Sequence, residues 1–256
     1  MEFIGSAVTD IGISKSTNQD SILIKIARTK MGRQIALGII CDGMGGLEKG
    51  EVASATVIKE YERWFQDEMP QIIKNISLEM VAQDWIKMLK NLNYKIMNYG
   101  KSRNINLGTT FSAILIVDKQ YLIVHVGDSR IYKITDTLDL LTEDQTFVQR
   151  EVNRGTMTLD EAQNDSRRNI LLQCIGASPE INPETIFGEI KENTSILLCS
   201  DGFRHVLTEN EMYSYLNPNI LIEKEVMMQN SKQLVELVKK RDEKDNVTVG
   251  IIKCVL

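Results

Sequence analysis

The sequence predicts an α+β domain built from antiparallel sheets and blocks of helix. Short apolar runs rich in β-branched residues follow one another at hairpin spacing, whereas amphipathic helical stripes come in separate blocks. A regular alternation of strand and helix, which would predict a doubly wound parallel sheet, is not seen. The 256 residues include only 4 prolines, and no Gly/Ser-rich linker or internal repeat divides them, so we expect one domain over residues 1–256.

Seven short apolar runs have the length and composition of strands. Gly, Asp, Asn or Lys flank them, as expected where strands end in turns. Asp118, Lys119 and Gln120 separate two of the runs by a suitable hairpin length. The predicted strands cover residues 21–27, 34–41, 110–117, 121–126, 130–134, 194–199 and 247–252.

Three segments show helical periodicity instead. One runs from Ala53 to Phe65 and a second from Leu78 to Met97, each with apolar residues three and four positions apart. Near the C-terminus, Ser231 is predicted to cap a third helix that presents Leu234 and Val238 to the core. We interpret all three apolar stripes as faces that pack against the sheets.

Composition excludes several classes of protein. With 30 Lys and Arg, 35 Asp and Glu and a net charge of −5, the chain lacks the basic surface of a dedicated nucleic-acid binder. The first five residues include an acid and no apolar core, so we expect no signal peptide, and no apolar run approaches the roughly 20 residues that span a bilayer. We therefore expect a cytoplasmic protein with no nucleic-acid or membrane partner. Its scattered cysteines are predicted to be buried, reduced thiols: Cys41, Cys174, Cys199 and Cys254.

The most informative residues are aspartates at strand ends. Asp42, Asp128 and Asp201 each follow a predicted strand, and Asp245 precedes the last one. Carboxylates that converge at one end of a sheet repel one another, and their pKa values rise, unless cations lie between them. Oxygen ligands of this kind suit Mg²⁺ or Mn²⁺. The spacing alone leaves two interpretations open, a metal site or Asp-Gly pairs that only form turns.

Bound cations at these aspartates would suit the hydrolysis of phosphate esters. Two ions about 3.5–4 Å apart can share a bridging water, lower its pKa toward neutrality and deliver a hydroxide to phosphorus. The signatures of other phosphate enzymes are absent from the sequence. No cysteine is followed by arginine at the C-x₅-R spacing, no D-x-D occurs, and the run from Gly45 to Gly50 lacks the Lys-Ser/Thr of a phosphate loop.

Eight short motifs together resemble those of the metal-dependent serine/threonine protein phosphatases of the type 2C family, in their bacterial form. Any one of them is weak, but all eight occur in order through nearly the whole chain. They are KSTNQD at 15–20, DGMGG at 42–46, GTT at 108–110, VGDSR at 126–130, LTEDQ at 141–145, RRNIL at 167–171, SDG at 200–202 and DN at 245–246.

The resemblance implies a fold and a role for each site residue. The fold is a four-layer αββα sandwich, two antiparallel β-sheets flanked by helix pairs, with a flap subdomain at about residues 144–169. Asp42 would bridge two Mn²⁺ or Mg²⁺ ions, and the Gly43 carbonyl would bind one of them. Asp201 and Asp245 would bind the other ion, and Asp128 would bind a possible third. Asp20 would orient a metal-bound water, and Lys15 would contact the substrate phosphate.

The sequence departs from the family pattern at four positions. Lys15 replaces the usual arginine, which keeps the charge but loses the bidentate fork. Met44 stands where eukaryotic members have a histidine proposed as general acid, so no side-chain acid can be named. Gln19 and Gln145 replace a common glutamate and a frequent flap histidine. None of these changes touches the metal aspartates, so we expect an active enzyme.

The implied activity is metal-dependent hydrolysis of phosphoserine and phosphothreonine in proteins by a water or hydroxide that bridges the two ions, without a phosphoenzyme. We expect a monomer whose partners are phosphorylated proteins, including a serine/threonine kinase and its substrates. The alternative is a catalytically weak sensor or scaffold with the phosphatase fold, which only Lys15 and Gln19 support. A regulatory phosphatase dedicated to one phosphoprotein is a third option that the sequence leaves open.

Overall fold

Two five-stranded antiparallel sheets form the centre of the computed structural model, which describes residues 2–30, 32–44 and 49–255. Every strand pairs antiparallel with its neighbours. The first sheet has the order β1 (Glu2–Asp10), β10 (Val247–Val255), β9 (Thr194–Cys199), β6 (Arg130–Ile134) and β7 (Leu138–Leu140). The second has the order β2 (Ser21–Arg28), β3 (Gln34–Cys41), β4 (Phe111–Val117), β5 (Gln120–Val126) and β8 (Glu184–Glu189).

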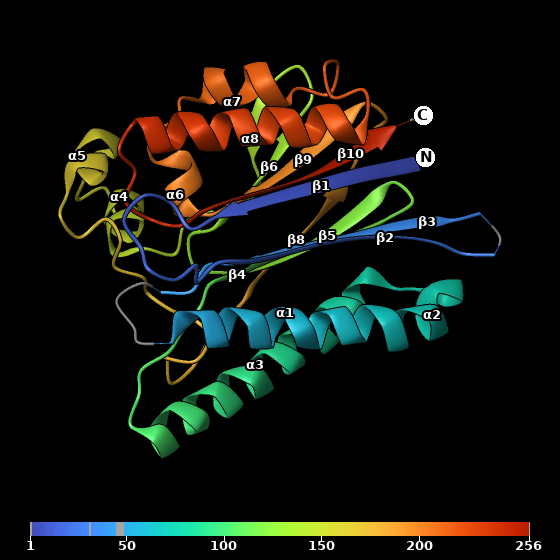
Figure 1. Ribbon diagram of the computed structural model, residues 1–256. Helices are drawn as coiled ribbons and strands as arrows, with labels where there is room; N and C mark the ends of the chain where they lie inside the picture. The colour runs from blue at the N-terminus through green and yellow to red at the C-terminus, as the bar shows by residue number, and fades with distance from the viewer. Residues whose placement is uncertain (1, 31, 45–48, 256) are drawn as a thin grey trace.

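Helices cover the outer face of each sheet (Figure 1). On the second sheet lie α1 (Gly50–Asp67), α2 (Met69–Ile72), a 3₁₀ turn (Ile73–Asn75) and α3 (Leu78–Arg103), and on the first sheet lie α6 (Asp201–Arg204), α7 (Glu209–Leu216) and α8 (Lys224–Lys240). The two remaining helices, α4 (Phe147–Asn153) and α5 (Leu159–Asn164), lie at one end of the sandwich. The predicted α+β fold, two antiparallel sheets between helix layers, is confirmed. Within the described ranges, no helix is both long and apolar enough to cross a bilayer.

Three layers of buried side chains hold the sandwich together. Trp85 and Leu89 of α3 pack on the second sheet, and Leu234 and Val238 of α8 pack on the first. Isoleucines and leucines fill the space between the sheets, with Ile114 fully buried among them. Burial of this kind stabilises by about 25 cal/mol per Å² of apolar surface. The layers therefore form a rigid mount for the loops that join strand ends.

The predicted strands agree with the structure to within about three residues, but three strands were missed. β1 contains Gly5 and Ser6 and has a mixed burial pattern, so it shows neither an apolar run nor a strict alternation. β7 is only three residues long. β8 is a short edge strand flanked by glutamates.

The prediction that Ser231 caps the last helix is wrong. The helix α8 begins seven residues earlier, at Lys224. Ser231 is buried in its middle, and its hydroxyl donates to the Met227 carbonyl oxygen at 2.8 Å. Met227 already belongs to the buried stripe, so the apolar face continues through the serine instead of starting after it.

Candidate active site

The strand ends that carry the predicted aspartates lie at one end of the sandwich, on the left in Figure 1. Asp20 leads into β2, Asp42 follows β3, and Asp128 lies in the turn from β5 to β6. Asp201 begins α6 directly after β9, and Asp245 precedes β10 by two residues. Antiparallel strands place both kinds of end at the same edge, and this is why residues so far apart in the chain meet here.

The carboxylates of this cluster are largely withdrawn from water. Asp20, Asp128 and Asp201 are 8%, 7% and 8% exposed, whereas the Asp245 side chain is 37% exposed. The Oδ2 atom of Asp20 is buried without a hydrogen-bond partner. A buried carboxylate oxygen left without a donor is costly, so this atom is suited to a ligand or a water.

Burial and mutual repulsion raise the pKa values of three of these aspartates. Burial acts first on Asp42, and the charges of Asp20, Asp201, Asp128 and Asp245 add to it, so the pKa of Asp42 lies well above its usual value. For the same two reasons, the pKa values of Asp20 and Asp128 rise to about 7. Such shifts are typical of functional sites that concentrate like charges.

Lys15 lies among the same carboxylates. Its Nζ is 2.8 Å from Asp245 Oδ1. Burial acts to lower the pKa of Lys15, but the hydrogen bond to Asp245 and the charges of Asp245, Asp42 and Asp201 outweigh it and raise the pKa. The predicted phosphate-contacting cation is therefore beside three of the predicted metal ligands.

Gly43 occupies a position that has no room for a side chain. A Cβ atom there would lie 2.4 Å from the Gln19 carbonyl oxygen and 2.7 Å from the Gly50 carbonyl. Gly43 N–H donates to the Gln19 carbonyl at 3.2 Å, and Thr109 Oγ1 donates to the Asp42 carbonyl at 2.9 Å. Gly45 and Gly46 of the same motif lie outside the described residues.

The side chains are close together but do not form a closed ligand shell. Among the residues whose positions are described, no group of three His, Cys, Asp or Glu side chains surrounds a common centre. The assignment of Asp42, Gly43, Asp201, Asp245 and Asp128 as metal ligands therefore stays a prediction.

A buried ion-pair network next to Asp128 was not found from the sequence. Arg130 donates to both carboxylate oxygens of Asp144, at 2.8 and 2.9 Å. Arg204 donates to Asp144 Oδ2 at 3.0 Å and to the Asp128 carbonyl oxygen at 3.3 Å. Although burial alone would raise it, Arg204 and Arg130 hold the pKa of Asp144 below its usual value. The network joins the start of the predicted flap to the helix that begins with Asp201.

Two further groups support the aspartates. His205 Nε2 lies 3.7 Å from Asp201 Oδ2, and its Nδ1 lies 3.5 Å from Glu243 Oε2. Glu243 accepts the backbone N–H groups of Lys244 and Asp245 at 2.7 and 3.0 Å. Glu243 therefore fixes the loop that carries Asp245. Nothing in the sequence marks it except its place two residues before that aspartate.

Asn246 ties the N-terminal loop to the last strand. Its Oδ1 accepts the Gln19 N–H at 2.9 Å. Its Nδ2 donates to the carbonyl oxygens of Ile11 at 2.9 Å and Thr17 at 3.2 Å. One amide thus holds both ends of the segment that contains Lys15.

Gly12 → Ala is expected to destabilise the protein and displace Asp245. Gly12 has a φ of +78°, and a Cβ there would lie 2.3 Å from the Asp245 carbonyl oxygen. Gly32 is the matched control, because its φ is +84° and its Cβ would meet nothing within 4 Å. Left-handed strain costs about 1 kcal/mol or more in both variants, and only Gly12 adds a backbone clash. The midpoint temperature of thermal unfolding, Tm, should therefore fall further for Gly12 → Ala than for Gly32 → Ala. An equal fall of Tm in both variants would contradict the close packing at Gly12.

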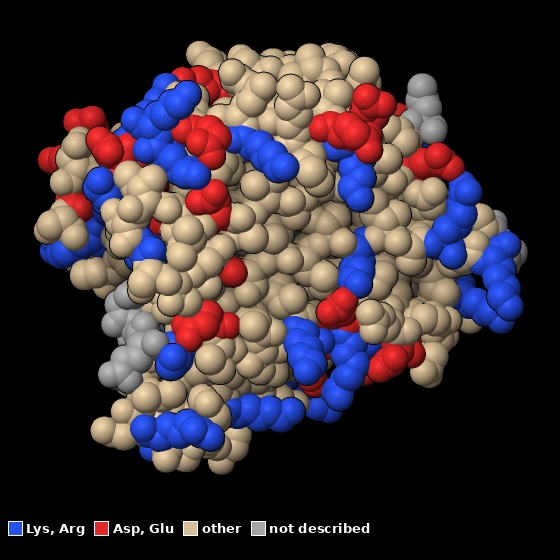
Figure 2. Space-filling model, in the orientation of Figure 1, with Lys and Arg blue, Asp and Glu red and all other residues tan. Residues whose placement is uncertain are grey.

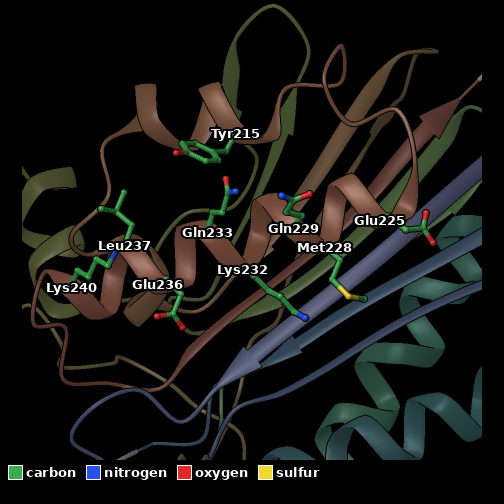
Figure 3. A pocket seen from close by; sticks show the side chains of 9 residues that line it. All are labelled: Tyr215, Glu225, Met228, Gln229, Lys232, Gln233, Glu236, Leu237 and Lys240. Carbon is green, nitrogen blue, oxygen red and sulfur yellow. The ribbon is translucent and has the colours of Figure 1, made fainter.

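One cavity of the described residues lies away from the aspartates. It is a groove of about 660 Å³ along α8 on the outer face of the first sheet, and Tyr215 of α7 faces it (Figure 3). Its charged side chains alternate in sign along the helix and lie apart from the aspartates: Glu225, Lys232, Glu236 and Lys240. A cavity of about 510 Å³ that includes Asp128 and Asp144 lies between α6 and the helices α4 and α5. This second cavity adjoins the candidate site.

The antiparallel sandwich and the motifs in their order are those expected of a protein phosphatase, the class of enzyme that the sequence predicts. A family model described as protein phosphatase 2C matches residues 13–239. The serine/threonine phosphatase stp of Listeria welshimeri is 30% identical over 219 residues, 84% of this chain and 83% of that protein. The chain belongs to the protein phosphatase 2C family.

Solved structures agree with this assignment. The structure of the S. agalactiae serine/threonine phosphatase has a TM-score of 0.84 and 28% identity, and covers 99% of this chain and 100% of that chain. The catalytic domain of the serine/threonine protein phosphatase PstP, solved in complex with 2 manganese ions, has a TM-score of 0.77 and 27% identity, with 99% of each chain covered. The predicted family and enzyme class are confirmed.

Proposed function

We propose that the protein hydrolyses phosphoserine and phosphothreonine esters of proteins with two Mn²⁺ or Mg²⁺ ions. Asp42, the Gly43 carbonyl, Asp201 and Asp245 would hold the two ions, and Asp128 would hold a possible third. The observation that carries the proposal is the gathering of aspartates from separate strand ends at one end of the sheets, where burial and neighbouring charges raise the pKa values of Asp20, Asp42 and Asp128. Family membership supports it, and so does the manganese complex of the similar PstP.

The residues present fit divalent cations. The side chains that converge offer carboxylate oxygens, the ligand type that Mg²⁺ and Mn²⁺ prefer. One of them, Asp20 Oδ2, is buried without a partner. The charge of two dications would outweigh the repulsion from the neighbouring aspartates that helps to raise the pKa of Asp42. When bound, such ions would activate a water for attack at phosphorus and neutralise charge on the phosphoryl oxygens.

The chain's own residues would position the reactants. Asp20 would accept a hydrogen bond from the attacking water through its unpartnered oxygen. Lys15, now paired with Asp245 at 2.8 Å, would turn to a phosphoryl oxygen as a single-point contact, because an ammonium cannot form the two-pronged contact of arginine. Met44 has no proton to donate, so the leaving serine or threonine oxygen would take its proton from water.

The wider arrangement follows from this proposal. Residues 1–256 would form one catalytic domain, and the flap at about 144–169, which contains α4 and α5, would cover the cavity beside Asp128. The enzyme would act as a cytoplasmic monomer on phosphoproteins, including a serine/threonine kinase and its substrates.

Hydrolysis of a phosphothreonine peptide tests the proposal. Activity is expected with Mn²⁺, is expected to vanish with a chelator, and is expected to return when Mn²⁺ is restored in excess. A phosphotyrosine peptide of the same sequence is the control and should be cleaved far more slowly. Hydrolysis that needs no divalent ion would overturn the mechanism. Calorimetric Mn²⁺ binding with no hydrolysis of either peptide would favour the sensor or scaffold instead.

A further inference from the structure

The part of α3 from Lys87 to its last residue, Arg103, has charged side chains of one sign only. Between Asp84 and Asp118 there is no acidic residue, in a protein whose net charge is −5. The same stretch has five cations, all of them exposed: Lys87, Lys90, Lys95, Lys101 and Arg103. We call these five residues the basic face. Figure 2 shows Lys and Arg in a row along the lower edge of the molecule, where α3 lies in Figure 1.

The basic face is not neutralised from within the protein. Most arginines elsewhere are paired with a carboxylate, as Arg33 is with Asp118, but no ion pair of the described residues includes any of the five cations. Arg103 lies over the ring of Tyr99, 4.8 Å from its centroid. Glu60 of α1, Glu68 at its C-terminal end and Asp84 border a small cavity together with Lys87 and Lys95, so some compensation is present at that side.

Helical spacing places most of the cations on one side of α3. Lys87, Lys90, Tyr94 and Lys101 are three, four and seven residues apart, the intervals that share a helix face. Tyr94 is 69% exposed at the centre of this face. The opposite side of the helix, with Leu89, Leu92 and Ile96, is buried against the sheet. The face therefore presents lysines and a tyrosine to solvent while the helix itself is held rigidly.

Hydrogen bonds connect the helix α3 to the candidate active site. Asn93 Oδ1 accepts the Gly176 N–H at 2.6 Å, and Ile175 exchanges backbone hydrogen bonds with Thr109 at 2.9 Å. Thr109 in turn donates to the Asp42 carbonyl. In Figure 1, the C-terminal end of α3 also lies on the same side of the molecule as the strand ends that carry the aspartates. The helix α3 is therefore held in a fixed position relative to the site.

We propose that the basic face of α3 binds an acidic segment of the phosphoprotein substrate while its phosphorylated residue occupies the active site. This inference rests on the proposed function and names the substrate class, phosphoproteins with an acidic stretch near the phosphorylated residue. Charge complementarity favours such a segment, because exposed lysines attract carboxylates and steer association. A short flexible segment can contact the basic face without contacting the rest of the surface. A long polyanion would also contact the rest of the surface, where acidic residues outnumber basic ones.

Two phosphothreonine peptides of identical core sequence test the proposal with the Mn²⁺-loaded enzyme. One has an extension of glutamates and the other has the same extension in glutamines, placed N-terminal in one pair and C-terminal in another. For at least one placement, kcat/KM at low salt should be about fivefold or more higher for the acidic peptide, as expected for a few surface charge pairs of modest energy each. The ratio should approach one as the salt concentration rises.

A matched pair of variants locates the effect. The triple substitution Lys90 → Gln, Lys95 → Gln, Lys101 → Gln should abolish the preference for the acidic peptide. The control is Lys224 → Gln, Lys232 → Gln, Lys240 → Gln on α8, three exposed lysines of the opposite helix layer, and it should keep the preference. Because the readout is a ratio between two peptides, a general loss of folded enzyme cancels.

Each remaining outcome has a defined meaning. Equal cleavage of the two peptides by the wild type, or a preference that survives the α3 substitutions, would overturn the docking role while the phosphatase activity stands. No cleavage of either peptide would contradict the proposed function itself. Lysine-dependent binding to phosphatidylglycerol vesicles or to a single-stranded oligonucleotide, with no preference between the peptides, would assign the face to another polyanion and overturn the proposal.

Discussion

Asp42 → Asn is expected to abolish activity while leaving the metal-free protein as stable as the wild type or more stable. Loss of a carboxylate that is proposed to hold the metal ions should lower Mn²⁺-dependent kcat by about a thousandfold or more, the scale of removing a principal electrostatic group. Stability should not fall, because Asp42 is surrounded by four other aspartates that raise its pKa. Asparagine removes one charge from that repulsion at almost unchanged volume.

Steady-state hydrolysis and thermal unfolding in chelator measure the two effects of this substitution separately. Asp136 → Asn serves as control, because Asp136 is exposed near β7, away from the cluster, and should change neither quantity. A marked loss of metal-free stability in Asp42 → Asn would indicate a structural aspartate. Retained activity would remove Asp42 from the proposed metal site.

The metal-free protein is expected to be more stable at about pH 5 than at about pH 7.5. The pKa values of Asp20 and Asp128 rise from 3.8 to about 7 on folding. In that window the folded protein keeps protons that the unfolded chain has released, so the free energy of unfolding falls as pH increases. His125 opposes the trend below its usual pKa of 6.5, because burial lowers its pKa and the unfolded chain then binds the extra proton.

Mn²⁺ should reverse the order of the two stabilities. The ion binds ionised carboxylates, so its stabilisation grows with pH. At a hundred times its dissociation constant it adds about 2.7 kcal/mol, or roughly 5–10 °C in Tm for a chain of this size. Calorimetric or circular-dichroism melts at both pH values, with chelator and with Mn²⁺, measure this. The double variant Asp20 → Asn, Asp128 → Asn should flatten the metal-free pH dependence, and an unchanged slope would mean that other groups cause it.

The parts of the fold that the sequence predicted are those with a strong local pattern. Strands such as β3 and β4, buried on both faces, show as unbroken apolar runs. The missed strand β1 is stabilised by pairing with β10 along its whole length, from Glu2 with Val255 to Asp10 with Val247. That pairing joins opposite ends of the chain, so no local window of sequence contains it.

Some residues of the candidate site could likewise be predicted from a local pattern, and others could not. Aspartates beside glycine at strand ends mark Asp42 and Asp201 in the sequence, and antiparallel geometry then brings them to one edge. The supporting groups have no such signal. Arg204 meets Asp144, and Glu243 meets His205, only because α6 packs beside the flap and the loop before β10. Lys15 was predicted as a phosphate contact, and its ion pair with Asp245 became visible only in three dimensions.

The amide of Asn246 has a consequence for the timing of synthesis. It holds Gln19, a residue 227 positions earlier, and Ile11 and Thr17 with it. While a ribosome is still making the middle of the chain, Lys15 and Asp20 have already emerged, but Asn246, Asp245 and the strand that pairs with β1 do not yet exist. The site can therefore assemble only after β10 has left the exit tunnel. A nascent chain therefore has Lys15 and Asp20 long before it can act as a phosphatase, because the site also needs the loop and strand that follow Glu243.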